Sequence, residues 1–395
     1  MRTPGRFRAK AVLGLLVSGC LAAEPDPAAD GDRPPREIPG TPQEFPAAFS
    51  VVRAVMALPD GRVVVSDAQE NRLTLIDFPK GTSRSLGRVG AGPGEFSRAG
   101  GLYRARGGGV VLFDHELRRL LPVLPSGELG EIVGLPTGGA AGFWSARGPD
   151  PLMVDSVGHT YTAIRSGGFT APASVLLRYR PGAGPDTITR LLRTTTREVT
   201  GPVKGMEYQE VLFSPADAWT VSPDGRIAVV RAAPYRVEWI PLTGPVVTGP
   251  AVRLKPVPVT RREKELIASG AAGSRGRITV TIGVVPAGGA PTTPAGPPAP
   301  IPVGELLFAK AKTPVDLRAG SWPLLDESGV LWVKRSLPGG AKANVFDLFD
   351  RDGNLVDRIA LPAGSRLVGF DRQWLYTVRI DADDFEHLQR FPLPR

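Results

Sequence analysis

The residues that could carry out chemistry are few and widely spaced. The chain has three histidines, His115, His159 and His387, and a single cysteine, Cys20. It contains no G-x-S-x-G nucleophile motif, no H-E-x-x-H zinc motif and no Walker A loop. The histidines fall in three different repeats of the chain, so a shared metal site would require all three to point into one channel. The motifs therefore predict no cofactor and no metal site of their own, and they favour a protein without enzymatic activity.

Two stretches look like ligand sites but are better interpreted as turns. The segment DADDFEHL carries Asp381, Asp383, Asp384 and Glu386, but it lacks the glycine and the ligand spacing of a calcium loop. We predict a strand-to-strand turn there. The glycine-rich segment at 87–103 lacks the spacing and the lysine of a phosphate-binding loop. We predict that it connects two structural repeats, with Phe96 packed between them.

Composition favours short strands and argues against a nucleic-acid partner. The 395 residues include 48 glycines and 41 prolines, and 42% of them are hydrophobic. These values are typical of many short strands joined by turns. The net charge of +9 includes four basic residues among the first nineteen. The remaining arginines are scattered and are not interleaved with aromatic residues, so binding to nucleic acid is not predicted.

The N-terminus predicts export and lipid anchoring. A basic start is followed by the short apolar run 11–17, which is too short to span a bilayer. The tetrad from Val17 to Cys20 resembles the bacterial lipobox, which implies a signal peptide at 1–19 and acylation of Cys20. The alternatives are a buried cysteine in a short helix and an ordinary cleavage site with a coincidental cysteine. Leu21 follows where an inner-membrane protein would usually carry Asp, which implies the outer membrane, on its periplasmic side or at the cell surface. Residues 20–45, rich in Pro and Ala, predict a tether.

One sequence pattern recurs from residue 48 onward and predicts the fold. Apolar runs alternate with turns, and the turn glycines lie at Gly61, Gly109, Gly158, Gly225 and Gly329. The first two intervals are 48 and 49 residues, which is the length of one four-stranded sheet, and a shorter sixth copy ends the chain. A repeat of this kind is typical of a β-propeller. We predict an all-β, six-bladed propeller with four-stranded antiparallel blades over residues 46–395. Two β-sandwiches are the alternative.

Two segments depart from the repeat. The sixth copy holds only about three strands, so we expect an N-terminal strand from residues 34–47 to complete the last blade, and deletion of 30–47 to lower the melting temperature sharply. Residues 256–318 form an insertion between the fourth and fifth copies. Within it, 261–268 has a helical composition, with Thr260 as N-cap and Glu263 three residues later. The insertion is either a lid over one mouth of the ring or a surface excursion.

Certain polar positions resemble the NHL repeat. In the first copy Asp67, Asn71 and Arg72 match that phrase. In the second copy Asp114 and Arg119 match it, while Arg118 replaces the asparagine. In the fourth copy the aspartate is absent and Arg231 stands near its place. The chain as a whole resembles bacterial six-bladed β-propeller lipoproteins of uncharacterised function. This resemblance implies the fold more strongly than any activity.

Two hypotheses about function follow. Propellers bind ligands at the mouth of their central channel. The residues that we place at the entry of the innermost strands are Arg53, Arg104, Asp155, Asp217 and Asp371. The first hypothesis is a monomeric, membrane-anchored module that binds a protein, peptide or glycan of the cell envelope. The alternative is an NHL-like envelope hydrolase or lyase with a divalent metal in the channel, which rests on analogy alone.

Overall fold

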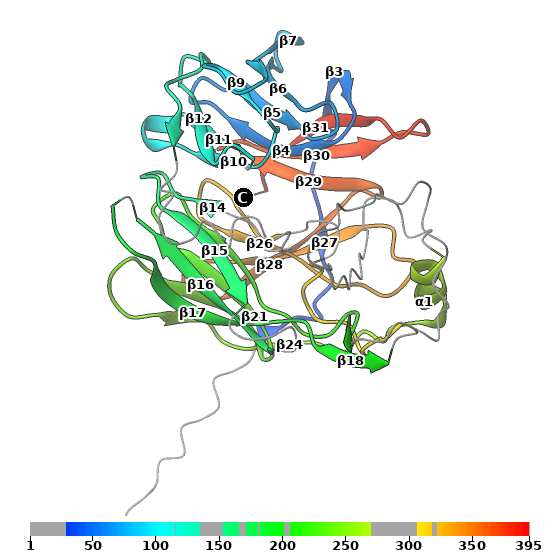
Figure 1. Ribbon diagram of the computed structural model, residues 1–395. Helices are drawn as coiled ribbons and strands as arrows, with labels where there is room; N and C mark the ends of the chain where they lie inside the picture. The colour runs from blue at the N-terminus through cyan, green and yellow to red at the C-terminus, as the bar shows by residue number, and fades with distance from the viewer. Residues whose placement is uncertain are drawn as a thin grey trace, which may run out of the picture.

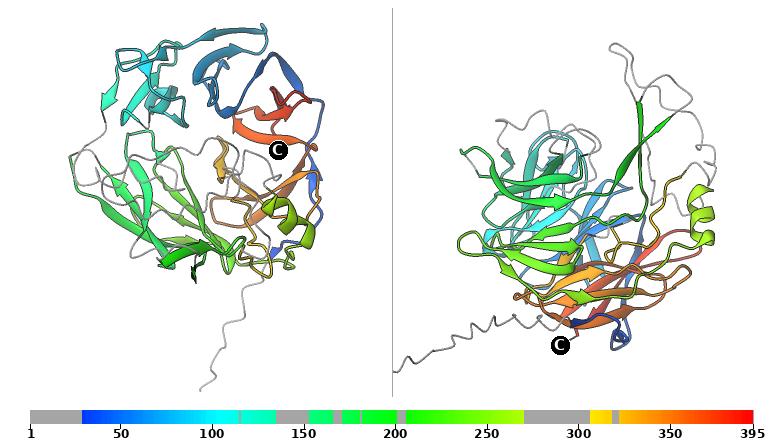
Figure 2. Two further views of the ribbon diagram at one scale, coloured as in Figure 1. Left: turned by 45° about the vertical axis from the view of Figure 1, so that its right-hand side comes forward. Right: turned by 90° about the horizontal axis from the view of Figure 1, so that it is seen from below.

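A computed structural model describes residues 29–114, 116–134, 153–165, 171–180, 182–200, 206–269, 306–317 and 322–394. Cys20, the predicted signal peptide and His115 lie outside these residues. Six sheets of four or five strands are arranged radially around a common centre, and the left view of Figure 2 shows this arrangement. The first strands of neighbouring blades contact one another and are therefore innermost. The protein is a six-bladed β-propeller, as the repeat predicts.

Each blade is an antiparallel meander of four strands, and they are labelled in Figure 1 where space allows. Blade one consists of β4 (Val52–Ala57), β5 (Val63–Asp67), β6 (Arg72–Asp77) and β7 (Thr82–Ser85). Blade two consists of β10 (Leu102–Arg104), β11 (Val110–Asp114), β12 (Arg119–Val123) and β13 (Val133–Gly134). Blade three consists of β14 (Met153–Val154), β15 (Thr160–Arg165), β16 (Ala173–Tyr179) and β17 (Asp186–Leu192). Blade four consists of β20 (Ala218–Val221), β21 (Ile227–Ala232), β22 (Tyr235–Ile240) and β23 (Val247–Thr248).

The last two blades recruit strands from the N-terminus. Blade five consists of β25 (Leu324–Leu325), β26 (Leu331–Lys334), β27 (Asn344–Phe349) and β28 (Leu355–Leu361), with β2 (Arg36–Glu37) added in parallel to β28. Blade six consists of β29 (Ser365–Phe370), β30 (Trp374–Ile380) and β31 (Glu386–Pro392), and its outer strand is β3 (Gln43–Phe49). An N-terminal strand therefore completes the last blade, as predicted. This strand, β3, begins at Gln43 rather than near residue 34, because β2 before it pairs with blade five.

The hydrophobic cores lie between adjacent blades. Each sheet is packed between two others, so a strand can be buried on both of its faces. All five residues of β5 are buried in this way. One core joins blades one and two and includes Val64, Leu112 and Phe96. Phe96 is 1% exposed and comes from the glycine-rich connector, in the short parallel pair β8 (Arg88–Val89) and β9 (Glu95–Phe96). It fills the interblade core as the sequence predicts.

The NHL-like residues fix the connections between strands. Asp67 accepts hydrogen bonds from the backbone N–H groups of Ser50 and Val51, which enter blade one. The Asn71 side chain bonds Ser97 O and Ala99 N in the connector to blade two. Asn71 has a φ of 48°, and Arg118, the equivalent residue of blade two, has a φ of 50°. The repeat therefore conserves the left-handed turn even where the asparagine is replaced.

The N-terminal segment adds strands to blades five and six and pairs with one strand outside the blades. β1 (Ala29–Asp30) lies parallel to β24 (Val252–Arg253), β2 adds to blade five and β3 closes blade six. Gly31 permits the first of these contacts, because a Cβ there would lie 2.2 Å from Leu254 and 2.8 Å from Arg253 O. Residues 29–45, which the sequence assigns to the tether, thus lie against the propeller.

Buried charges hold the same segment in place. The Asp347 carboxylate, fully buried, lies 3.0 Å from Arg358 Nε and accepts a hydrogen bond from the Tyr235 hydroxyl. Burial raises the pKa of Asp347, and the two neighbouring arginines oppose that shift. Those arginines, Arg335 and Arg358, donate to the backbone carbonyls of Gly31 and Arg33. The buried cluster therefore connects blade five to the N-terminal segment.

The elements between blades lie mostly around blades three to five. A hairpin of β18 (Thr196–Thr200) and β19 (Met206–Glu210) separates blades three and four, and the sequence gives no signal for it. Helix α1 (Arg261–Ala268) begins at Thr260, and Thr260 and Glu263 form the predicted capping box. Lys312 pairs with Glu263 and so joins the two described parts of the insertion. No helix among the described residues is long and apolar enough to cross a membrane.

Closure of the ring predicts a large effect at one side chain of β3. Phe45 is 1% exposed and packs with residues of blades one and six, including Val63 and Val378. We expect Phe45→Ala to lower the free energy of unfolding by about 3–5 kcal/mol, because it leaves a cavity between the two blades. Chemical denaturation measures this value. Ala47→Ser, at an exposed position of the same strand, is the control, and an equal effect of both changes would contradict the assignment.

Candidate functional site

The turns between the first and second strands of the blades lie on one face of the ring. We call them the inner turns: residues 58–62, 105–109, 155–159, 222–226, 326–330 and 371–373. The inner turns of blades three and four touch, because Ser156 N donates to Pro223 O over 3.0 Å. The opposite face, where the chain enters each first strand, is called the connector face. Three of the five predicted residues, Arg104, Asp155 and Asp371, leave the first strand at the inner turns, and only Arg53 and Asp217 enter it.

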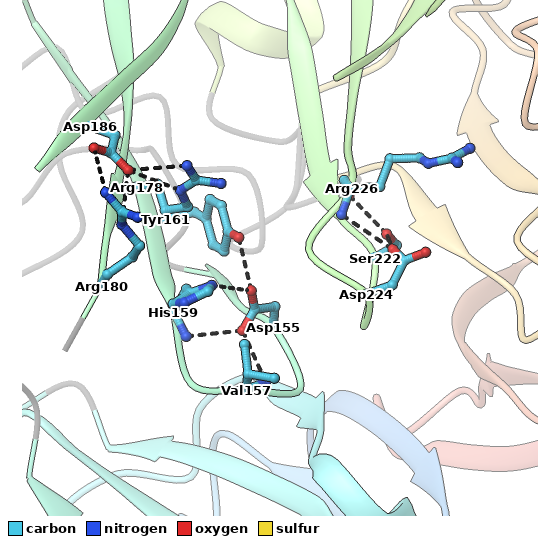
Figure 3. Close-up of polar contacts among 10 residues, drawn as sticks. All are labelled: Asp155, Val157, His159, Tyr161, Arg178, Arg180, Asp186, Ser222, Asp224 and Arg226. Atoms are coloured by element: carbon cyan, nitrogen blue, oxygen red, sulfur yellow. Dashed lines mark hydrogen bonds and ion pairs between the residues drawn. The ribbon is translucent and has the colours of Figure 1, made fainter. Parts of the chain in front are cut away.

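Asp155 organises the inner turn of blade three, as Figure 3 shows. Its Oδ1 accepts hydrogen bonds from the backbone N–H groups of Val157 and His159. Its Oδ2 lies 2.8 Å from His159 Nδ1 and accepts the Tyr161 hydroxyl at 2.9 Å. Burial and the adjacent carboxylate raise the pKa of Tyr161, so the phenol stays protonated and donates. The Asp155 side chain is fully buried, and all of these contacts stabilise the turn.

The same arrangement recurs in two other blades. Asp371 Oδ1 accepts hydrogen bonds from the backbone N–H groups of Gln373 and Trp374, and Oδ2 accepts one from the Tyr376 hydroxyl. Asp326 accepts the backbone N–H groups of two turn residues and the Trp332 indole N–H. In each case an aspartate ends the first strand, and an aromatic donor follows five or six residues later. Asp155 and Asp371 are therefore positioned by the structure of their turns.

The two residues at the connector face have different surroundings. Arg53 is an exposed residue of β4 close to Tyr103, whose pKa burial raises to about 12 while Arg53 opposes the shift. Asp217 accepts the backbone N–H groups of Leu192 and Ala232 and pairs with Arg231 at 2.9 Å. Arg231 thus replaces the missing aspartate of the repeat as the charged residue of its strand, and Asp217 supplies the opposite charge.

A cavity of about 590 Å³ opens among the inner turns of blades one, two, five and six. It contains Arg104 and Asp371 of the predicted residues, and Arg53, Asp155 and Asp217 are not among its lining residues. Apolar walls come from Leu58, Pro59, Pro79 and Trp374. Its charged lining residues are Asp60, Arg62, Asp77, Arg104, Glu327, Asp371, Arg372 and Arg390. We call this the mouth cavity. Its size and its mixture of apolar and charged groups are typical of ligand sites.

An ionic bridge crosses the mouth cavity. Arg104 ends the first strand of blade two, and its guanidinium contacts Glu327 in the inner turn of blade five, the blade on the opposite side of the ring. The second oxygen of the Glu327 carboxylate lies 3.5 Å from Nε of Arg372 in blade six. The Arg372 side chain is 89% exposed, so this second contact is weak.

A second cation lies at the outer part of the mouth cavity. The Arg390 guanidinium stacks between the rings of Trp374, 4.2 Å from the centroid, and Phe78, at 4.6 Å. Its Nε donates to the Gln43 side chain over 2.9 Å. Arg390 is 8% exposed, and it interacts with the Gln43 side chain, the Tyr376 hydroxyl and the two rings but forms no ion pair with a residue that the structure describes. A buried cation without a carboxylate partner leaves a favourable place for an anion.

The carboxylates of the mouth cavity already have partners. Asp60 is held by Arg62, whose hydrogen bonds keep the pKa of Asp60 below its usual value although burial acts in the opposite direction. Lys80 lowers the pKa of Asp77 by a hydrogen bond to its carboxylate. The Asp371 carboxylate accepts hydrogen bonds from Gln373 N and from the Tyr376 hydroxyl. Arg372 and Arg390 are the charged groups of the cavity that have only a weak carboxylate partner or none among the described residues. They remain able to bind a charged ligand, so the cavity favours an anion.

The described histidines lie far apart in the fold. His159 belongs to the inner turn of blade three, whereas His387 in β31 lies 2.7 Å from Asp381 and 3.3 Å from Glu44. Asp381 shapes the predicted turn between β30 and β31, where its carboxylate accepts the backbone N–H groups of Asp383 and Phe385. Among the residues that the structure describes, no three or more His, Cys, Asp or Glu side chains gather as a metal site would require.

Comparisons with known proteins give the fold only. No known family profile matches the chain, and no curated protein matches it. Among solved structures, the chain is similar to a member of the DUF4221 family from Bacteroides vulgatus, with 9% identity, 90% of this chain and 97% of that chain covered, and a TM-score of 0.49. It is similar to a Bacteroides fragilis protein named as exported, with 8% identity, 93% and 99% coverage and a TM-score of 0.48.

A third similar structure is a gluconolactonase of Xanthomonas campestris, with 14% identity, 94% and 99% coverage and a TM-score of 0.39. At identities and TM-scores this low, none of the three carries an argument about ligand or activity.

The sequence does not reveal Glu327, Arg372 and Arg390 as members of one site. Glu327 and Arg372 follow the turn-forming aspartates Asp326 and Asp371, and each is an exposed residue of its turn. A search for charged residues directly after the aspartate of each inner turn would have found both. Arg390 has no such signal, because its position depends on the pairing of β3 with β31.

The geometry of Asp155 predicts a structural role. We expect Asp155→Ala to lower the free energy of unfolding by about 1–3 kcal/mol, because two backbone N–H groups and the Tyr161 hydroxyl lose their acceptor. Denaturant unfolding provides the measurement. Asp352→Ala is the matched control, since Asp352 is an exposed turn residue that contributes only its backbone N–H, and we expect it to stay within about 0.5 kcal/mol of the wild type. A wild-type stability of Asp155→Ala would show that the turn does not need this carboxylate.

Proposed function

We propose that the protein is an exported lipoprotein whose propeller binds a protein, peptide or glycan of the cell envelope at the mouth cavity. The observation that carries the proposal is the mouth cavity itself, where apolar side chains and two cations without a strong carboxylate partner line the same cavity. The rest of the ring is held by buried cores and occupied turns. A rigid platform with a charged cavity among its inner turns is suited to binding.

The place of the N-terminal segment supports this proposal. Its described part begins at β1 beside β24, and neither strand contributes a residue to the mouth cavity. The tetrad ending at Cys20 supports lipid attachment, and Leu21 supports the outer membrane as the destination. Acyl chains on Cys20 would hold the chain at the membrane, because each buried methylene contributes about 0.8 kcal/mol. We propose that the protein acts as a monomer at the membrane and uses no cofactor.

Lipid attachment predicts the behaviour of two variants. Cells grown with labelled palmitate should incorporate the label into the wild-type chain and retain it in the membrane fraction. The Cys20→Ala chain should lose the label. The double variant Cys20→Ala/Ala22→Cys keeps one cysteine but moves it out of the tetrad, and it should also remain unlabelled. Labelling of the double variant would contradict recognition of the tetrad.

Ligand binding at the mouth cavity is tested by crosslinking in intact cells. A photoreactive amino acid at Gln373, an exposed residue of the mouth cavity, should give crosslinked envelope species. The same amino acid at Asp383 is the control, because Asp383 is an exposed turn residue at the opposite end of β30, on the connector face. Crosslinks of the same species from both positions, or from Asp383 alone, would overturn the assignment of the site.

A further inference from the structure

We infer that the mouth cavity recognises an acidic polypeptide segment, and that Glu327 occupies the place of a ligand carboxylate until the ligand displaces it. This inference rests on the proposed function, because it names the ligand class of the same cavity. It starts from the ionic bridge, where one carboxylate holds two guanidinium groups that come from different blades.

The bridge is built so that its carboxylate can be exchanged. Asp326 fixes the backbone of the inner turn in blade five, through hydrogen bonds from Ser328 N and Val330 N, and Gly329 adopts a φ of 86°. The Glu327 side chain takes no part in these turn contacts. It can therefore leave Arg104 and Arg372 while the backbone of the turn stays in place.

The two guanidinium groups can accept another carboxylate in its place. Arg104 is 19% exposed and is held from behind by a hydrogen bond to Ala57 O, so its position does not depend on Glu327 alone. Arg372 is 89% exposed and reaches Glu327 only at 3.5 Å. A ligand carboxylate between them would form the charge-assisted hydrogen bonds that arginine makes best.

Arg390 supplies a place for a second negative group. It lies in the same cavity, is 8% exposed and is stacked between two aromatic rings, so its guanidinium is held in one orientation. Because its contacts among the described residues are with an amide, a hydroxyl and two rings, an incoming anion need not displace an internal acid there. The ligand that fits carries at least two carboxylates.

The walls of the mouth cavity favour a peptide over an acidic glycan. Between the charged groups lie Leu58, Pro59 and Pro79, whose aliphatic surfaces suit the methylene groups of glutamate side chains better than a polyhydroxylated ring. Arg390 already covers one face of the Trp374 ring on which a sugar could stack. Recognition of acidic segments by groups of arginines is a recurring mode of peptide binding. An extended segment also places its side chains at regular intervals along the cavity.

The test is a titration of the full-length protein in a non-ionic detergent with fluorescent hexaglutamate, followed by anisotropy. Glu327→Gln should bind about two- to fivefold more tightly than the wild type, because the internal competitor loses its charge. Arg372→Gln should bind about three- to tenfold more weakly, and all affinities should fall as salt is raised. Arg372 is so exposed that its substitution should leave the melting temperature unchanged.

The controls come from a similar ion pair elsewhere. Arg98 is 65% exposed and lies 3.5 Å from Glu116 on the connector face. Arg98→Gln and Glu116→Gln should bind hexaglutamate as the wild type does. Equal effects of Arg98→Gln and Arg372→Gln, or an unchanged affinity of Glu327→Gln, would overturn the inference.

Two further outcomes separate this inference from the proposed function. Tighter binding of hexagalacturonate than of hexaglutamate would overturn the peptide assignment. If neither probe binds while Gln373 still gives specific crosslinks, the acidic ligand class is wrong and the binding module stands. If Gln373 gives no specific crosslinks, the proposed site fails whatever the probes do.

Discussion

The pairing of β3 with β31 is the constraint on which the rest of the ring depends. It joins the N-terminal end of the described chain to the C-terminal end and gives blade six its fourth strand. Without β3, the edge of β31 would present unpaired backbone groups, and the core between blades six and one would lose Phe45 and Phe49. Gln43 pairs with Arg390 in this ladder and accepts its Nε–H. Closure of the ring therefore also sets the position of a cation in the mouth cavity.

Different blades use different residues to fix the chain at the start of the first strand. Each blade must fix the chain where it enters the first strand, and a carboxylate that accepts several backbone N–H groups does this well because those groups would otherwise lack acceptors. Asp67 plays this part in blade one from its second strand. In blade four the carboxylate comes from Asp217 in the connector, and Arg231 in the second strand is its partner. The exchange of charges explains why the NHL-like phrase fades along the chain while the fold persists.

The blades could be predicted from the sequence because each is a local pattern. Turn glycines 48 and 49 residues apart in the first three copies, together with alternating apolar runs, determine the four-stranded unit, and the missing strand of the last copy indicates closure by the N-terminus. Contacts between distant segments are different. β2 holds only two residues and follows a proline-rich stretch, so no periodicity predicts that it adds to blade five.

The site was predicted only in part for the same reason. Arg104 and Asp371 are predictable as residues near the first strands, but the residues that form the cavity with them come from other blades. Glu327 is 223 residues from Arg104 in the sequence and meets it only because blades two and five face each other across the ring. Asp155 was selected by the same rule as Arg104, and its side chain is buried in its own turn. Position along a strand cannot distinguish these cases, because the direction of each side chain depends on the turn that follows.

The structure separates the charges that maintain the fold from those that remain for a ligand. Asp155, Asp326 and Asp371 each satisfy several donors within one turn, so any change there disturbs the backbone. Glu327 and Arg372 each follow such an aspartate and extend from the turns that those aspartates hold. Their contact can form or break without a cost in backbone order. A ligand that replaces this contact meets a rigid ring, so its binding energy is not spent on reshaping the protein. The inner turns thereby combine a fixed backbone with exchangeable charges at the mouth cavity.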